Sequence, residues 1–282
     1  TLVRSNDIYR YGKDSEASGG WLGELGGDNY RGFVNYGDNS IGYADNGSFT
    51  FAETREIRQE GRAFNGDYKC NTSYWTGEYG TYGFHPNNYN LMYSPVESEL
   101  YRTRDGGVSW ELVHDFGGNK TLQVIVSWSD PNTIYLTHYE GSSNNNIWKS
   151  EDAGENWTEI TPSGFAGVNG YKYIEVDDQD KNKVWAILIN GSGNDKVLQS
   201  LDGGSSWTNI SGTALDNEQV VSIKHHYGTD DGLYVGTRRG VYYKNASMND
   251  WALFNNELPA SVNCQFLQPY YGEGTIRMAS QR

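Results

Sequence analysis

Short apolar segments recur along the chain, and each of them follows a polar turn. The turns are rich in Asp, Asn, Pro or Gly, and the segments behind them are Ile41–Tyr43, Leu91–Tyr93, Ile134–Leu136, Val184–Ile187, Leu233–Val235 and Ile276–Met278. Short apolar runs between turn-forming residues indicate β-strands, because a helix would need a longer run of apolar residues at helical spacing. We expect each segment to be the second strand of one repeat, which predicts six repeats.

A second pattern runs in phase with the first, an octapeptide with the frame Ser/Thr-x-Asp-x-Gly-x-x-Trp. It occupies Thr103–Trp110, Ser150–Trp157 and Ser200–Trp207, and a degenerate copy at Lys244–Trp251 keeps the tryptophan without the Asp and Gly. Successive tryptophans of the intact copies are 157 − 110 = 47 and 207 − 157 = 50 residues apart, a spacing typical of one four-stranded propeller blade. Apolar residues flank each copy, so we expect a strand, a tight turn and a strand.

The residue types of this frame are explained by turn chemistry. The aspartate accepts hydrogen bonds from backbone N–H groups just downstream, and the glycine supplies a positive φ. The tryptophan buries a large ring against a neighbouring blade while its N–H finds an acceptor. We therefore predict a structural role, and not a catalytic one, for the frame positions Asp105, Gly107, Trp110, Asp152, Gly154, Trp157, Asp202, Gly204 and Trp207.

This frame resembles the Asp-box (bacterial neuraminidase) repeat of sialidases, sortilin-type receptors, xyloglucanases and many secreted bacterial propellers. The resemblance implies an all-β fold, a β-propeller of four-stranded blades. It lies in the turns of the blades, so it carries no information about an active site.

The repeats predict six blades, with seven blades or a piece of a larger ring left open as alternatives. Ile8–Tyr11 and Trp21–Leu25 are predicted to be a third and a fourth strand, whereas the chain stops after the second strand at Ile276–Met278. We expect both termini to share the last blade, which would leave no open sheet edge. Residues 1–282 are then a single propeller domain, either alone or as a module of a larger exported protein.

The amino-acid composition agrees with a propeller fold and excludes some classes of partner. The sequence has 35 Gly, 22 Tyr and 9 Trp, as an all-β architecture would. A formal charge of −14 argues against nucleic acid as a partner, and there is no apolar run of the ~18 residues that a membrane span requires. The chain begins at Thr1 without a signal peptide, which we interpret as a mature or trimmed product. Cys70 and Cys264 allow at most one internal disulfide, and their pairing is left open.

The longest departure from the repeat, residues 53–82, is the predicted ligand-binding segment. We expect it to connect the outer strand of one blade to the inner strand of the next, opposite the octapeptide turns. Aromatic rings beside charged groups suit sugars, which stack on rings and need polar partners for their hydroxyls. The predicted ligand contacts are Arg62, Tyr74, Trp75, Glu78 and Tyr79, and a solvated loop pinned by its rings is the alternative.

An enzyme is the second hypothesis, and its candidate residues are fewer. Arg31, in a segment that resembles the first blade of sialidases, could begin an arginine clamp for a substrate carboxylate, although the proline expected after it is absent. Arg238, Arg239 or Arg277 could complete the clamp, with Tyr270 or Tyr271 as nucleophile. A xyloglucanase-like site would instead pair Asp45 with Glu78 as general acid and base.

No metal site or other cofactor is predicted, with calcium at Asp178, Asp180 and Asn182 left open as an alternative. Asp178, Asp180 and Asn182 alternate like the start of a calcium loop but lack its later Gly and Glu, and they fall where other repeats have a polar turn. His225 and His226 are adjacent on a predicted strand and therefore point to opposite sides. The sequence as a whole predicts an extracellular propeller that binds a glycan or a protein, with a glycoside hydrolase as the alternative.

Overall fold

The computed structural model describes the strands within residues 1–81 by their backbone alone, and nearly all residues after Gly80 in full. From residue 82 on, the described residues exclude 108, 119, 140–144, 165–170, 189–193, 255–261, 272–273 and 282. The chain forms two compact units, Thr1–Val124 and Ile125–Arg282. Every described sheet is antiparallel, and the described residues contain no helix that could cross a membrane.

The first unit contains three sheets. One has three strands, β1 (Leu2–Val3), β2 (Asp7–Tyr11) and β3 (Trp21–Gly26), and the next has β4 (Gly32–Val34), β5 (Ile41–Asn46) and β6 (Phe49–Glu56). The third has four strands, β7 (Gly83–Phe84), β8 (Met92–Val96), β9 (Glu99–Thr103) and β10 (Glu111–Asp115). In all three, strands that follow one another in the chain are neighbours in the sheet.

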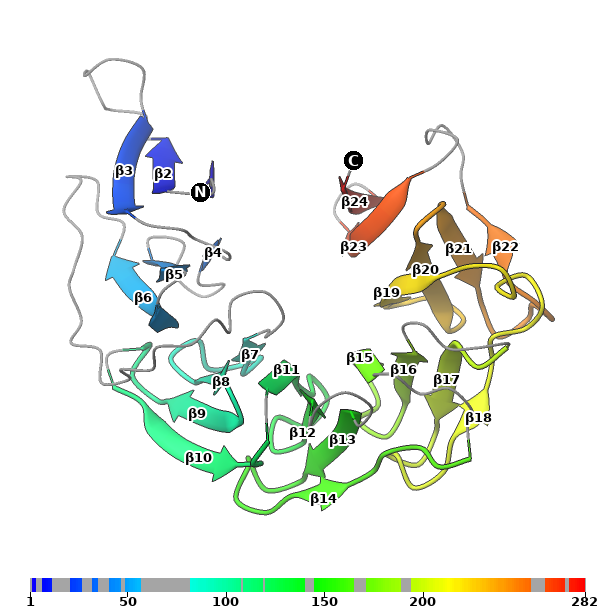
Figure 1. Ribbon diagram of the computed structural model, residues 1–282, viewed down its shortest axis with the longest axis horizontal. Helices are drawn as coiled ribbons and strands as arrows, with labels where there is room; N and C mark the ends of the chain where they lie inside the picture. The colour runs from blue at the N-terminus through cyan, green and yellow to red at the C-terminus, as the bar shows by residue number, and fades with distance from the viewer. Residues whose placement is uncertain are drawn as a thin grey trace. The chain divides into compact units, whose positions relative to one another are not determined.

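Three further four-stranded sheets follow with the same order (Figure 1). Their strands are β11 (Lys120–Val126), β12 (Ile134–Tyr139), β13 (Asn145–Ser150) and β14 (Thr158–Glu159); β15 (Tyr171–Val176), β16 (Val184–Leu188), β17 (Val197–Ser200) and β18 (Thr208–Asn209); and β19 (Val220–His226), β20 (Gly232–Thr237), β21 (Val241–Lys244) and β22 (Ala252–Leu253). A last sheet pairs β23 (Asn263–Tyr270) with β24 (Thr275–Gln281).

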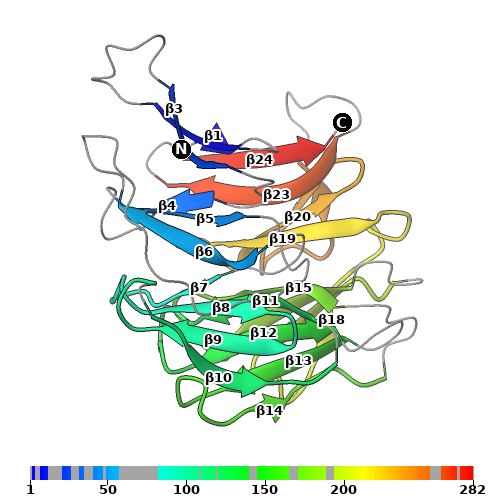
Figure 2. The same ribbon diagram turned by 60° about the vertical axis from the view of Figure 1, so that its left-hand side comes forward.

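Burial explains how these sheets pack in the second unit. All five residues of β16 are buried, as expected for a strand whose sheet is covered on both faces. The outermost strands β14, β18 and β22 have two residues each, all exposed. The first strands β15, β19 and β23 lie next to one another, with β19 beside both others (Figure 2). The unit is therefore a stack of sheets, each with a buried inner part and an exposed outer edge.

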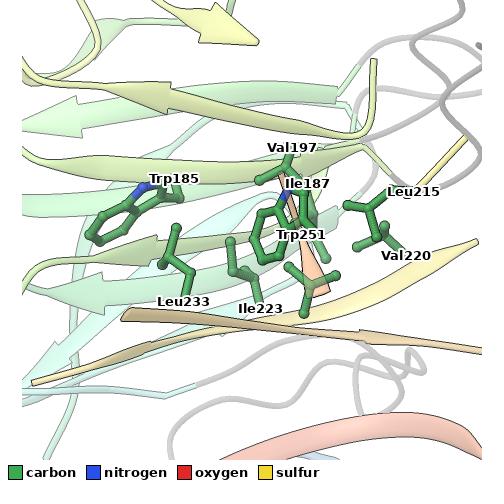
Figure 3. Close-up of a cluster of buried hydrophobic side chains, with 9 residues drawn as sticks. Trp185, Ile187, Val197, Leu215, Val220, Ile223, Leu233 and Trp251 are labelled. Carbon is green, nitrogen blue, oxygen red and sulfur yellow. The ribbon is translucent and has the colours of Figure 1, made fainter. Parts of the chain in front are cut away.

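Figure 3 shows how one interface between sheets is filled. Trp185 and Ile187 of β16 pack with Ile223 of β19, Leu233 of β20 and the ring of Trp251, all nearly inaccessible to solvent. A second cluster on the other face of the β15–β18 sheet contains Tyr135, Ile147, Val176, Val184 and Leu198. Successive residues of β16, such as Val184 and Trp185, thus enter the two different clusters, because strand side chains alternate between faces.

The structure confirms the all-β class and the four-stranded antiparallel sheets. Each of the six predicted segments overlaps the second strand of its sheet in chain order, these being β5, β8, β12, β16, β20 and β24, and only Leu91 lies outside its strand. Closure of the last blade is not confirmed: β2 pairs with β1 and β3, and β24 pairs with β23. The number of blades and the closure stay predictions.

Candidate functional site

The repeated octapeptides form the turns between the third and fourth strands. Asp202 Oδ1 accepts hydrogen bonds from Ser200 Oγ at 2.8 Å and from the Ser206 N–H at 2.8 Å. Its Oδ2 accepts from Ser206 Oγ at 2.6 Å, and these bonds lower the pKa of the Asp202 carboxyl to about 2, the Ser206 side chain contributing most. Asp152 and Asp105 make the equivalent contacts in their own turns. The carboxylates are thus occupied by groups of the turn itself.

The glycine of each octapeptide is required by its backbone and its surroundings. Gly107, Gly154 and Gly204 have φ values of 96°, 97° and 93°, where a side chain is strained. The Gly204 N–H donates to Ser200 Oγ at 2.7 Å, a bond within the octapeptide turn itself. A Cβ on Gly204 would lie 2.4 Å from Ile160 Cδ1, so no other residue fits there without a shift of its neighbour.

The tryptophan of the octapeptide connects neighbouring sheets. Trp207 donates its indole N–H to the Ile160 carbonyl at 3.0 Å, and Trp251 donates to the Ile210 carbonyl at 2.8 Å. Ile160 and Ile210 are matching positions just after β14 and β18, so one contact recurs from sheet to sheet. The degenerate copy ending at Trp251 has lost the Asp and Gly but makes this contact, whereas Trp157 donates to Gly154 in its own turn at 2.9 Å.

A continuous row of aromatic side chains crosses the last two sheets, and we name it the aromatic strip. It extends from β19 to the end of β23 and consists of Tyr271, Tyr227, His226, Tyr234, Tyr243 and Phe254. Neighbouring ring centroids are 4.9–6.5 Å apart, and the rings of Tyr227 and Tyr271 meet edge to face. Tyr227, Tyr271 and Phe254 are 45%, 50% and 39% exposed, so the strip presents ring faces and edges to solvent.

Polar groups border the strip where β15, β19 and β23 end. Lys224 Nζ is 2.5 Å from Glu175 Oε1, and the same oxygen accepts the His225 backbone N–H at 3.2 Å. Burial raises the pKa of the Glu175 carboxyl, although the Lys224 ammonium opposes this shift. The Tyr271 hydroxyl accepts the Tyr227 N–H at 3.1 Å. This end of the strip therefore combines rings with a cation, a carboxylate and a phenol hydroxyl.

Of the residues predicted for a sialidase-like site, the structure describes Arg238, Arg239, Arg277, Tyr270 and Tyr271. Burial raises the pKa of the Tyr271 hydroxyl, whereas a phenolate nucleophile needs a lowered one. Arg277 lies with its guanidinium carbon 4.0 Å from the Tyr270 ring centroid. Arg238 and Arg239 directly follow β20. They lie at the opposite end of this six-residue strand from the turn before β20, where the Tyr271 hydroxyl contacts Tyr227. Arg31, the first member of the predicted clamp, lies outside the described residues.

Most of the predicted ligand-binding segment is also outside the described residues. This applies to Arg62, Tyr74, Trp75, Glu78, Tyr79 and Cys70. Residues Glu53–Glu56 belong to β6, so they are part of a strand and not of a connecting loop. Asp45 lies in β5, which is described by its backbone alone. Cys264 is a buried free thiol with its Sγ 3.9 Å from Ser222 Oγ, and burial raises its pKa to about 11.

The residues proposed as a calcium loop form an ordinary polar turn between β15 and β16. Asp180 Oδ1 accepts the Asn182 N–H at 2.9 Å, and the Asn182 carbonyl accepts the Gly203 N–H at 2.8 Å. The oxygens of this turn are thus bound to its own backbone and to the octapeptide turn of the same sheet. Among the described residues, potential metal-ligand atoms converge elsewhere, at Asp177, His225 and Asp231.

Comparison with known proteins supports the fold that the repeats predict. The family model described as Sortilin, neurotensin receptor 3 matches residues 98–215, which include all three intact octapeptides. No curated protein sequence matches the chain.

Several solved structures share the fold. They include the GH74 xyloglucanase from Xanthomonas campestris (TM-score 0.62, 11% identity, 86% of this chain and 40% of that one), the extracellular domain of BT4673 from B. thetaiotaomicron (0.62, 14%, 90% and 31%) and YCF48 from Cyanidioschyzon merolae (0.55, 15%, 85% and 75%). The chain thus spans 40% or less of the xyloglucanase and of BT4673. At this low identity the likeness concerns the fold alone. The comparisons confirm that the chain has a β-propeller fold and that it resembles sortilin-type propellers.

Proposed function

We propose that this protein is an extracellular β-propeller domain that binds a glycan without transforming it. The aromatic strip is the observation that carries the proposal. Exposed Tyr227 and Tyr271 offer ring surfaces to the C–H faces of a sugar, and the hydroxyl of Tyr271 and the ammonium of Lys224 lie beside them. Binding sites of this kind need rings and a few placed polar groups, whereas an enzyme also needs a convergent acid, base or nucleophile.

The polar border favours a glycan over a protein partner. Sugar hydroxyls need placed polar partners beside the stacking rings, and Lys224 and Glu175 lie at the end of the strip. If the partner is a protein instead, the glycan array described below should show no binding. The extracellular neighbour BT4673 supports the proposed location outside the cell.

The segment 53–82 remains part of the proposal as a second contact region. Trp75 and Tyr79 are its proposed stacking rings, with Tyr74 beside them and Arg62 and Glu78 as polar partners. Its concentration of rings and charges outside the repeat is the supporting observation. The two regions can be separated experimentally, because a variant in one leaves the other unchanged.

The test is a glycan array containing xyloglucan, β-glucan and sialoside probes, followed by calorimetric titration of the best probe. We expect Tyr271→Ala to lower affinity by at least about tenfold, since removal of a central ring typically costs ~2 kcal/mol. Trp75→Ala tests the second region in the same way. Tyr89→Ala is the matched control, because Tyr89 is 40% exposed and lies before β8. Full affinity in both Tyr271→Ala and Trp75→Ala would refute the proposed sites.

A glycoside hydrolase is the alternative function, and the same probes decide it. Release of reducing ends from xyloglucan that is abolished by Asp45→Ala, or release of sialic acid that is abolished by Arg31→Ala, would replace the binding proposal. The xyloglucanase neighbour motivates the first probe.

We also propose that residues 1–282 form one propeller of six blades, in which β2 and β3 complete the sheet of β23 and β24. The support is that β23 and β24 are the first and second strands of a repeat, and β2 and β3 form an antiparallel pair of the kind that a third and a fourth strand make. Amide hydrogen exchange tests this: protection of Ile8–Tyr11 that is lost when residues 275–282 are deleted would support closure. Unchanged protection would refute it.

A further inference from the structure

Three side chains from two neighbouring sheets, none of them a member of the aromatic strip, bring metal-ligand atoms together. Asp177 follows β15, His225 is in β19, and Asp231 is in the turn before β20. One carboxylate oxygen of each aspartate and one imidazole nitrogen all lie within 4.8 Å of one another. Asp177 and His225 are buried, and Asp231 is partly exposed, so the cluster is open to solvent on one side.

His225 is the member of this cluster that lacks a hydrogen-bonding role. Its side chain is 5% exposed, its Nε2 is 3.9 Å from Asp177 Oδ2, and its buried Nδ1 has no hydrogen-bond partner among the described residues. The ring is held by stacking on Trp185, with centroids 4.9 Å apart and planes 26° from parallel. The Nε2 atom thus faces the Asp177 carboxylate beyond hydrogen-bonding distance, so the oriented imidazole can place this nitrogen on a metal ion between them.

A cation already lies beside these ligands, in the form of Lys183. Its ammonium is hydrogen-bonded to Asp231 and lies 4.0 Å from Asp177 Oδ2. It also lies 5.9 Å from the ring centroid of Trp185, a position where a cation is attracted by the aromatic face. The ammonium therefore balances two carboxylates but leaves the imidazole unused.

We propose that Asp177, His225 and Asp231 bind a divalent transition-metal ion, with Zn²⁺ as the favoured ion, in exchange for the ammonium of Lys183. Imidazole selects transition metals over Ca²⁺ and Mg²⁺, and two carboxylates with one imidazole form a ligand set that Zn²⁺ accepts. Three protein ligands leave a coordination position for water or for an oxygen of a bound ligand. The ion would also join two sheets, because Asp177 belongs to one and the other two ligands to the next.

Calorimetry with Zn²⁺ and absorption spectroscopy with Co²⁺, both on the untagged full chain, test this site. We expect one ion per chain, and Lys183→Met should bind it at least about tenfold more tightly, because a competing charge has been removed close to the ligands. His225→Gln and Asp231→Asn, each introduced into Lys183→Met, should weaken binding by at least about tenfold and remove the visible Co²⁺ band. His85→Gln is the control for adventitious binding to another histidine.

Circular dichroism of each variant separates loss of the site from loss of the fold, and Asp231→Asn serves where His225→Gln does not fold. The proposal is overturned if neither the parent nor Lys183→Met binds Zn²⁺ or Co²⁺ at about 1 mM. It is also overturned if Lys183→Met binds no more tightly than the parent, or if His225→Gln and Asp231→Asn leave binding unchanged.

Discussion

Replacement of Trp251 by Phe tests whether the indole–carbonyl contact holds neighbouring sheets together. The ring of Trp251 is 4% exposed, and its N–H donates to the Ile210 carbonyl at 2.8 Å. Phenylalanine keeps an apolar ring but leaves that carbonyl without this donor, which costs about 1–2 kcal/mol. The smaller ring also buries less apolar surface, which adds about 1 kcal/mol at ~25 cal/mol per Å². The expected loss is therefore about 2–3 kcal/mol of unfolding free energy.

Thermal unfolding monitored by circular dichroism measures this loss. For a domain of this size, about 2–3 kcal/mol corresponds to a decrease in Tm of roughly 4–12 °C. Trp128→Phe is the matched control, because Trp128 is 61% exposed and its replacement should change Tm little. If Trp251→Phe melts within about 1 °C of the parent, or no lower than Trp128→Phe, the contact does not stabilise the stack of sheets.

Three further predictions concern the octapeptide turns. Asp152→Ala should lower Tm, since the Asn156 N–H loses its acceptor, but should leave glycan affinity of the folded protein unchanged; lost affinity at an unchanged Tm would contradict a structural role. Acid should destabilise the fold between about pH 4 and pH 2: the pKa of Asp202 is lowered to about 2, so its contribution is complete above the unfolded pKa of ~3.9 and disappears as pH falls through the folded value. A Tm measured against pH should decrease less steeply in this window for Asp202→Asn, and an identical profile would contradict the assignment. Gly204→Ala should cost about 1–3 kcal/mol, because its φ is 93° and the new Cβ would meet Ile160 at 2.4 Å. Gly117→Ala, with φ at 68° and open space around it, should cost less in urea unfolding; an equal loss would remove the steric part of the explanation.

Turn chemistry and short apolar runs were sufficient to predict the second strands, because both are local signals. The aromatic strip could not be predicted in this way. Tyr227 and Tyr271 follow β19 and β23, and Tyr243 lies within β21, so nothing within any one segment distinguishes these rings from core residues. The sequence instead directed attention to Tyr271 as a nucleophile, a role that its raised pKa does not favour.

The cluster of Asp177, His225 and Asp231 was not predicted from the sequence, for a related reason. The sequence correctly places His225 and His226 on opposite sides of a strand: His225 stacks on Trp185, whereas His226 lies beside Tyr271. Asp177, which lies beside His225 in the cluster, comes one repeat earlier in the chain. Polar contacts between sheets recur at this spacing. Lys183 and Asp231 are 48 residues apart, and Lys224 and Glu175 are 49 apart. A search for ligand residues separated by one repeat, rather than by a few residues, could have found the cluster.

The central claim is that the exposed rings at the ends of β19 and β23 bind a glycan that the protein does not cleave. Calorimetric titration of the parent and Tyr271→Ala with a xyloglucan oligosaccharide, cellohexaose and a sialoside, followed by chromatography of the same samples, tests both parts together. We predict saturable binding of at least one probe, an affinity at least about tenfold lower for Tyr271→Ala, and intact sugar in every sample. Cleaved sugar in the parent sample, or equal affinity of parent and variant, would contradict the account.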